Sequence, residues 1–175
     1  MITIQNMSFA YKKHDVFRDL SLNVSKGGIY GLLGLNGSGK STLLYLMCGL
    51  LRAKSGSVMY KGKDVKKRLP SVLSDMFIVP EEFELPNLTL SKYVEINSKF
   101  YPNFSMEMLD KSLAAFAMDK ETNLAESSMG QRKKVFLCFA LATNTSLLLM
   151  DEPTNGLDIP SKSMFRKAVA ECMTD

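Results

Sequence analysis

The most informative run of residues in this chain is Gly34-Leu35-Asn36-Gly37-Ser38-Gly39-Lys40-Ser41. It has the spacing of a phosphate-binding loop, in which glycines let the backbone curl so that successive N–H groups point at phosphate oxygens. The helix that follows adds the positive end of its dipole. In this pattern Lys40 reaches the β- and γ-phosphates, and the Ser41 hydroxyl binds Mg²⁺. The residues expected to contact the phosphorylated ligand are Asn36, Gly37, Ser38, Gly39, Lys40, Ser41 and Thr42.

The alternative is a glycine-rich turn that precedes a helix for structural reasons alone. Residues 29–33 argue against it, because they form an apolar run typical of a strand, and a phosphate-binding loop connects a strand to a helix. After the loop, an apolar stripe at helical spacing predicts a helix that faces the core through Leu43, Leu44, Met47 and Leu50.

Length and composition fit one globular domain. The 175 residues are 46% hydrophobic, which is enough for a core of ordinary size. The formal net charge of +4 is mildly basic and does not indicate a nucleic-acid partner. A solvated face is the expected role of four nearby lysines, Lys61, Lys63, Lys66 and Lys67.

The three cysteines, Cys48, Cys138 and Cys172, are widely spaced and form no C-x-x-C pair. This pattern predicts neither a disulfide framework nor a zinc site, and it fits reduced thiols in the cytoplasm. The N-terminus lacks the apolar run of a secretion signal, and no run of about 18 apolar residues occurs. A role at a membrane would therefore need another chain or another segment.

Strand and helix patterns alternate along the chain. Ser105 is expected to cap a helix, and Pro80 to end a strand. Residues 12–15, which include His14, are expected to form the turn of a hairpin. The predicted strands cover residues 2–11, 16–24, 58–60, 76–79 and 147–150, and the predicted helices cover residues 90–100, 105–116 and 135–142.

The apolar run over residues 147–150 ends in Asp151 and Glu152. Such a run is typical of a strand buried on both faces, and open α/β sheets bind ligands at the carboxyl ends of their strands. Asp151 would orient Mg²⁺, and Glu152 would polarise the attacking water as a general base. The alternative is a pair of acids that cap the turn before Pro153. The complete phosphate-binding loop upstream favours the catalytic interpretation.

These residues together resemble the ATP-binding subunit of an ATP-binding-cassette (ABC) transporter, and the resemblance covers nearly all of the chain. It implies an α/β fold, a P-loop NTPase core with an N-terminal antiparallel β subdomain and a helical insertion subdomain. The implied single domain has its core and β subdomain in residues 1–87 and 136–175, and its helical subdomain in residues 88–135. The implied cofactors are ATP and Mg²⁺, with Lys40 and Glu152 as the catalytic residues of an ATP hydrolase.

Ser128-Met129-Gly130-Gln131 is similar to the signature sequence of that family and, like it, opens a helix. By resemblance, the Ser128 side chain and the Gly130 backbone contact the γ-phosphate of ATP held by the loop of a second subunit. A helix N-terminus with a hydroxyl beside it is an anion site in its own right. Met129 stands where the family usually has a glycine. The alternative role for Ser128 is a helix cap, which is compatible with the first.

Two further positions follow from the resemblance. Residues 155–158, Asn-Gly-Leu-Asp, resemble the loop that communicates between the two nucleotide sites of a dimer, and Asp158 also suits a cap for a helix that begins near Pro160. Tyr11 stands at a position similar to the family's adenine-stacking aromatic residue, and it offers a flat face for the base. The alternative for Tyr11 is an exposed tyrosine at the end of a strand.

The chain departs from the family pattern at two places. Glu81 stands where the family has a glutamine associated with Mg²⁺, the attacking water and the transmembrane partner. A carboxylate there keeps the option of binding metal but adds negative charge near Asp151 and Glu152, and the alternative is a solvated acid of the loop. The family's γ-phosphate histidine is absent, because the single histidine, His14, precedes the phosphate-binding loop. We therefore expect a C-terminally truncated chain that binds nucleotide better than it hydrolyses it.

The leading functional hypothesis is the motor subunit of an ABC transporter, which dimerises on ATP and drives export or import by a separate transmembrane permease. It would lie in the cytoplasm, on the cytoplasmic face of the membrane. A second hypothesis is a soluble ABC ATPase that acts on ribosomes or DNA, and the modest basic charge argues against it. A third is a non-hydrolytic ATP-binding module, which Glu81 and the absent histidine keep open.

Overall fold

A computed structural model describes residues 1–171, so that the prediction for Cys172 lies outside the described residues. The chain divides into two compact units, Met1–Leu73 (unit 1) and Ser74–Asp175 (unit 2). Each unit is described separately. This division does not test the proposed helical subdomain at 88–135, which stays a prediction.

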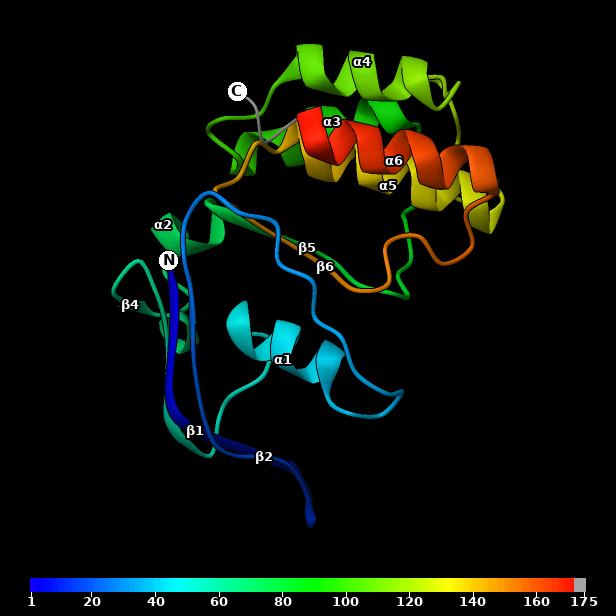
Figure 1. The fold of residues 1–175 in the computed structure, drawn as a ribbon. Coiled ribbons are helices and arrows are strands. Elements are labelled where there is room, and N and C mark those ends of the chain that lie inside the picture. The colour runs from blue at the N-terminus through cyan, green and yellow to red at the C-terminus, as the bar shows by residue number, and fades with distance from the viewer. Residues whose placement is uncertain (172–175) are drawn as a thin grey trace. The chain divides into compact units, whose positions relative to one another are not determined.

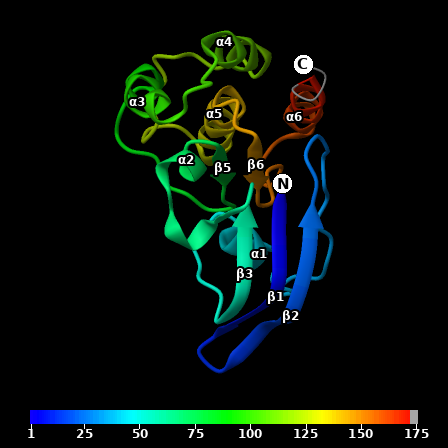
Figure 2. The ribbon, with the colours of Figure 1, turned by 90° about the vertical axis from the view of Figure 1, so that its left-hand side faces the viewer.

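Unit 1 is built on a four-stranded antiparallel sheet in the order β2-β1-β3-β4, with helix α1 packed against β3 (Figure 2). Its backbone also contains a short 3-10 turn and a one-turn helix. The elements are β1 (Ile2–Tyr11), β2 (His14–Val24), α1 (Lys40–Met47), β3 (Ser55–Tyr60), β4 (Lys63–Asp64), the 3-10 turn (Val65–Lys67) and α2 (Pro70–Leu73).

The predicted hairpin of the first two strands is confirmed. Ile2 pairs with Val24, and Tyr11 pairs with His14 across a tight turn. His14 therefore begins β2, and the prediction that it lies in the turn is wrong. The reason is that this hairpin turn needs only two residues. Alternation along β1 buries Ile2 and Ile4 on one face of the sheet.

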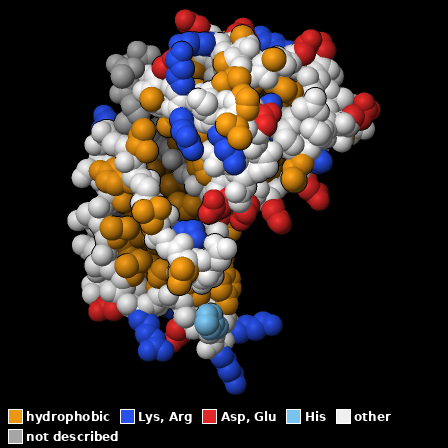
Figure 3. Space-filling model, turned by 45° about the vertical axis from the view of Figure 1, so that its right-hand side comes forward, with side chains coloured by type: hydrophobic (Ala, Val, Ile, Leu, Met, Phe, Trp, Pro, Cys, Tyr) orange, Lys and Arg blue, Asp and Glu red, His pale blue; other side chains and the backbone are white. Residues whose placement is uncertain are grey.

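The predicted strand at residues 29–33 is wrong. The segment from 28 to 35 adopts no regular structure, and its side chains are exposed, up to 93% for Leu33. Figure 3 shows that hydrophobic side chains reach the surface of the molecule. A strand needs a neighbouring backbone to take up its hydrogen bonds. Within unit 1, the strands that pair are β1 to β4, and this segment pairs with none of them.

Helix α1 is one turn shorter than the apolar stripe implies. Leu43 and Met47 are buried as expected, but Leu50 is 55% exposed and lies beyond the helix. Gly49 causes this end, because it adopts the left-handed conformation at φ +71°, which is typical of the residue that stops a helix.

Unit 2 holds two parallel strands and the longer helices, with β5 and β6 side by side (Figure 1). The strands predicted at 76–79 and 147–150 are confirmed, and the caps predicted at Ser105 and Ser128 are present. The elements are β5 (Met76–Val79), α3 (Leu90–Asn97), a 3-10 turn (Ser98–Phe100), α4 (Met106–Ala115), α5 (Met129–Ala142), β6 (Leu147–Met150) and α6 (Ile159–Glu171).

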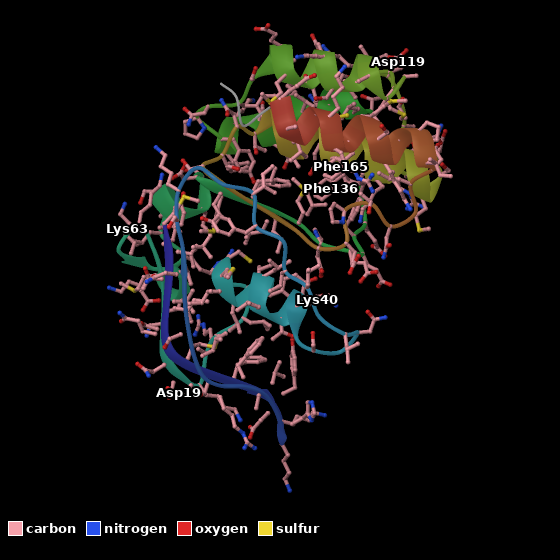
Figure 4. The ribbon with its side chains drawn as sticks, in the orientation of Figure 1. Asp19, Lys40, Lys63, Asp119, Phe136 and Phe165 are labelled. Atoms are coloured by element: carbon pink, nitrogen blue, oxygen red, sulfur yellow. The ribbon has the colours of Figure 1, made fainter. Side chains whose placement is uncertain are left out.

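The core of unit 2 is aromatic and centres on α5. Phe139 is 1% exposed, and the rings that surround it, with centroids 5.1–6.2 Å away, are Phe77, Tyr93, Tyr101 and Phe104. Phe136 of α5 and Phe165 of α6 belong to the same core (Figure 4). Large aromatic side chains bury much apolar area and thus hold α5 against the strands and the neighbouring helices.

Replacing Phe139 with alanine should lower the free energy of unfolding by about 3–5 kcal/mol, because it empties the centre of this aromatic core. Chemical denaturation followed by circular dichroism measures the loss. The matched control is Phe100→Ala, since Phe100 is 65% exposed and its truncation should cost little. Equal losses for the two variants would contradict the proposed core.

Candidate functional site

The loop at residues 34–41 has the backbone of a phosphate cradle. Gly37 and Gly39 adopt φ values of +78° and +97°, a region that side-chain-bearing residues rarely enter. The Ser38 N–H donates to the Leu35 carbonyl at 3.2 Å, and the Leu43 N–H donates to the Gly39 carbonyl at 2.8 Å. The first bond closes the turn and the second starts α1, so the loop passes directly into the helix N-terminus, where anions bind.

Gly39 is required for a second reason, which is space. A Cβ atom at this position would lie 2.7 Å from Val16 Cγ1 and 2.9 Å from Phe17 Cζ. Strand β2 therefore presses against the end of the loop and fixes its course. The spacing of the sequence motif and the tertiary packing thus demand the same residue.

Lys40 is the first residue of α1 (Figure 4). Its ammonium donates to the carbonyl oxygens of Gly34 at 3.0 Å and of Leu35 at 3.2 Å, so the side chain folds back over the loop. Phosphate oxygens are stronger acceptors than carbonyl oxygens because they carry charge. The two carbonyl partners of Lys40 are therefore weaker acceptors than a phosphate would be.

Tyr11 reaches the same end of α1. Its hydroxyl lies 3.4 Å from the Thr42 hydroxyl, and its ring packs edge-to-face on Phe9 at 4.9 Å. Thr42 is buried, whereas Tyr11 is 48% exposed. Within unit 1, the structure thus brings the proposed adenine-stacking residue next to the loop and leaves much of its ring open to a ligand.

In unit 2, the carboxyl ends of the two parallel strands carry the acidic residues. Val79 pairs with Met150, so Glu81 and Glu152 each lie two residues beyond a paired position. The Asp151 N–H donates to the Val79 carbonyl at 2.8 Å, and Asp151 is 4% exposed. Glu152 is exposed and adopts φ +43°, a conformation that is rare outside glycine and frequent at functional sites.

Glu81 is exposed in the loop after β5, as its alternative interpretation expects, and it also has hydrogen-bond partners. Its carboxylate accepts a hydrogen bond from the Asn155 amide at 3.0 Å, and its backbone carbonyl accepts one from the Lys133 ammonium at 3.2 Å. The structure therefore places Glu81 together with Asp151 and Glu152 at one end of the sheet.

Lys133 is 4% exposed, which is unusual for a lysine. Burial lowers the pKa of its ammonium below the usual value, and the negative charges of Glu81, Asp151 and Glu152 oppose that shift. The ammonium also lies 5.6 Å from the centroid of the Phe83 ring. Sequence reasoning missed Lys133, and it placed Asn155 in a functional loop without predicting the contact with Glu81. The available signal for Lys133 was a lysine three positions before Phe136, within the apolar stripe of its helix.

The signature-like residues begin α5. The Ser128 side chain accepts from the Gln131 N–H at 3.2 Å, and the Gln131 side chain accepts from the Ser128 N–H at 2.9 Å, which together form a capping box. A Cβ on Gly130 would lie 3.4 Å from the Gly156 carbonyl. The helix N-terminus and the loop at 155–158 thus approach closely, and Met129 is 73% exposed beside them.

Asp158 serves as the predicted cap of α6. Its carboxylate accepts from the Ser161 N–H at 2.7 Å and pairs with the Lys134 ammonium at 3.4 Å. The hydrogen bond from Ser161 and the nearby Lys134 hold the pKa of Asp158 below its usual value. Lys134 lies on α5, so this pair also links α5 to the loop at 155–158.

The proposed metal ligands Ser41, Asp151 and Glu81 offer only hydroxyl and carboxylate oxygens. This donor chemistry suits Mg²⁺, which prefers hard oxygen ligands and keeps several waters. Ser41 belongs to unit 1, and the two carboxylates belong to unit 2. Within residues 1–171, no group of three or more histidine, cysteine, aspartate or glutamate side chains is arranged to hold a metal ion by itself.

A glycine-rich loop that runs into a helix, acids that follow a parallel strand and a helix capped by Ser128 are together typical of an ATP-binding cassette. The sequence profile described as "ABC transporter" matches residues 17–155, and the chain belongs to that family. This membership and the solved structures below confirm the predicted α/β fold class.

Relatives with known names are similar over most of the chain. The ABC transporter ATP-binding protein YtrB of Bacillus subtilis is 32% identical over all of this chain, which spans 59% of the length of YtrB. The zinc uptake system ATP-binding protein ZurA of Listeria innocua is 34% identical over 98% of this chain and 71% of its own length. A solved ATP-binding subunit of an ABC transporter has a TM-score of 0.88 over 99% of this chain and 75% of its own, at 24% identity, a likeness of fold.

Replacing Gly39 with alanine should destabilise unit 1 by about 1–2 kcal/mol from the left-handed backbone alone, before the contacts with β2 are counted. Urea denaturation measures the loss. Gly31→Ala is the matched control, because a Cβ there meets nothing within 4 Å. A Gly39→Ala variant as stable as the control would show that the loop does not need this conformation.

Proposed function

We propose that this chain binds and hydrolyses ATP as the motor part of an ABC transporter. The observation that carries the proposal is the loop at residues 34–41, where two left-handed glycines and a folded-back Lys40 form a phosphate cradle at the start of α1. Membership of the ABC transporter family supports the choice of ATP as the ligand.

In the proposed binding mode, the loop backbone and Lys40 hold the phosphates, and Tyr11 stacks on the adenine ring. Lys40 leaves the carbonyl oxygens of Gly34 and Leu35 for the β- and γ-phosphates. The contact between Tyr11 and Thr42 supports this arrangement, since it joins the base-stacking ring to the phosphate-binding helix. The residues from Asn36 to Thr42 provide the remaining contacts.

For hydrolysis, Glu152 accepts a proton from the attacking water, and its exposed position at the end of β6 supports this role. Ser41, Asp151 and Glu81 are the residues proposed to hold Mg²⁺. When bound, the metal neutralises charge that develops on the phosphate oxygens. Asp151 is well suited to orient a ligand, because its backbone is hydrogen-bonded to β5 and its side chain is buried.

A second copy of the subunit is proposed to complete each site. Ser128 and Gly130 begin a capped helix, and a helix N-terminus attracts anions. Gly130 carries no side chain and contributes only its backbone at this helix N-terminus. We therefore propose that these residues meet the γ-phosphate of ATP held by the loop of the other copy.

The proposed partner for transport is a separate transmembrane permease, to which the subunit would attach at the cytoplasmic face of the membrane. Among the described residues, no helix combines the length and the apolar character needed to cross a bilayer. Relatives are named for zinc uptake and for lipopolysaccharide export, so the family similarity spans both directions of transport. The proposal accordingly concerns the motor and leaves the cargo to the permease.

Replacing Lys40 with alanine should weaken ATP binding by about 10- to 100-fold or more, because hydrogen bonds to charged groups contribute about 1.5–3 kcal/mol each. Titration calorimetry on the full-length protein measures the affinity. Lys67→Ala, which removes an exposed lysine of unit 1, is the control for the loss of a charge. Unchanged affinity in Lys40→Ala would refute the phosphate-binding role of the loop.

Replacing Glu152 with glutamine should leave ATP binding intact and slow hydrolysis by about 10²- to 10⁴-fold, because the amide cannot accept the proton from water. ATP turnover and ATP affinity are measured on the same full-length preparation, together with the oligomeric state in ATP. We expect an ATP-bound dimer to accumulate. Turnover at the wild-type rate would exclude Glu152 as the base, and no turnover in the wild type would favour a non-hydrolytic module.

A further inference from the structure

Lys133 is a buried cation that the proposed chemistry does not use. It lies on α5, its side chain is almost wholly removed from water, and its ammonium donates to the Glu81 carbonyl at 3.2 Å. A buried ammonium costs free energy unless nearby groups compensate for its lost hydration. The Phe83 ring, 5.6 Å away, supplies one such contact. Packing alone therefore does not explain why a lysine is buried at this position.

The residues around Lys133 fix the segment that follows β5. The Lys133 ammonium binds the backbone of Glu81, while the Asn155 amide binds its carboxylate at 3.0 Å. Two residues further on, the Phe83 ring packs against Phe136 of α5, with centroids 4.4 Å apart. Glu81 is thus held at both ends, from α5 and from the loop after β6.

The charge of Lys133 also faces the acidic end of the sheet. Burial lowers the pKa of its ammonium, and the carboxylates of Glu81, Asp151 and Glu152 raise it. The parallel register of β5 and β6 brings the first and the last of these to the same edge. Three carboxylates in one place repel one another, and a fixed cation among them reduces this repulsion.

We propose that Lys133 is a positioning residue of the ATPase site: its buried ammonium ties Glu81 to α5 and offsets the carboxylate charge at the ends of β5 and β6. The proposal rests on the function proposed above for Glu81, Asp151 and Glu152. It explains how the chain carries a glutamate at position 81, because Lys133 supplies the matching positive charge. It also joins α5, whose first turn holds Ser128 and Gly130, to the acids that act on metal and water.

The kinetic test compares Lys133→Met in the full-length protein with Lys99→Met, which removes an exposed lysine of the same unit. Loss of Lys133 should lower kcat about tenfold or more, because a displacement of about 1 Å in a catalytic site has large effects on rate. The KM for ATP should stay within about threefold, since Lys133 is not among the phosphate-binding residues. Lys133→Arg, which keeps the positive charge, should retain more of kcat than Lys133→Met. Equal kcat for Lys133→Met and Lys99→Met, or equal kcat for Lys133→Arg and Lys133→Met, would overturn the proposal.

A double-mutant cycle on stability tests the proposed coupling between Lys133 and Glu81 without ATP. Its result decides the proposal even if the protein does not hydrolyse ATP. Lys133→Met should reduce the folding equilibrium constant at least about fivefold more in the wild-type background than in the Glu81→Gln background. Additive effects would overturn the proposal. If Lys133→Met alone does not fold, a folded variant that carries both Lys133→Met and Glu81→Gln would support the coupling. An unfolded double variant would refute it.

Discussion

The parallel pairing of β5 with β6 is the constraint on which unit 2 depends. Its register sets Val79 against Met150, so the residues that follow each strand emerge at one edge. That edge receives Glu81 from one strand and Asp151 and Glu152 from the other. Parallel strands have no tight connection, and the chain between these two forms α3, α4 and α5, which supply the aromatic core and the buried Lys133. The pairing of β5 with β6 therefore determines both the position of the acidic residues and the packing of the aromatic core.

Unit 1 meets a different demand, which is to hold the open backbone of the loop at residues 34–41. Two features within the loop fix its course, the left-handed glycines and the closed turn at Ser38. The contact of β2 with Gly39 fixes it from a neighbouring strand. Lys40 occupies the loop carbonyls with its own ammonium. In the proposed binding mode only Lys40 changes partners and the loop backbone keeps its course, and such preorganisation favours affinity.

Local signals made much of this predictable. The hairpin of β1 and β2, the caps at Ser105 and Ser128, and the loop at 34–41 depend on residues close in sequence. Two features were not predictable, because they depend on residues that are far apart in the sequence. The apolar run at 29–33 becomes a strand only if another backbone pairs with it, and Lys133 acquires meaning from Glu81, which is 52 positions away. The proposed offset of charge between Lys133 and the carboxylates arises from the fold, and little in the sequence indicates it.

The central claim is that ATP is hydrolysed in sites shared by two copies, with the loop of one copy facing Ser128 and Gly130 of the other. The most direct measurement mixes two inactive full-length variants, Lys40→Ala and Gly130→Arg, and records ATP turnover. In a mixed dimer, one site retains an intact loop from the second variant and an intact helix N-terminus from the first. We predict turnover in the mixture that neither variant shows alone. A mixture that stays inactive at every ratio, at concentrations where the wild type is active, would contradict the claim.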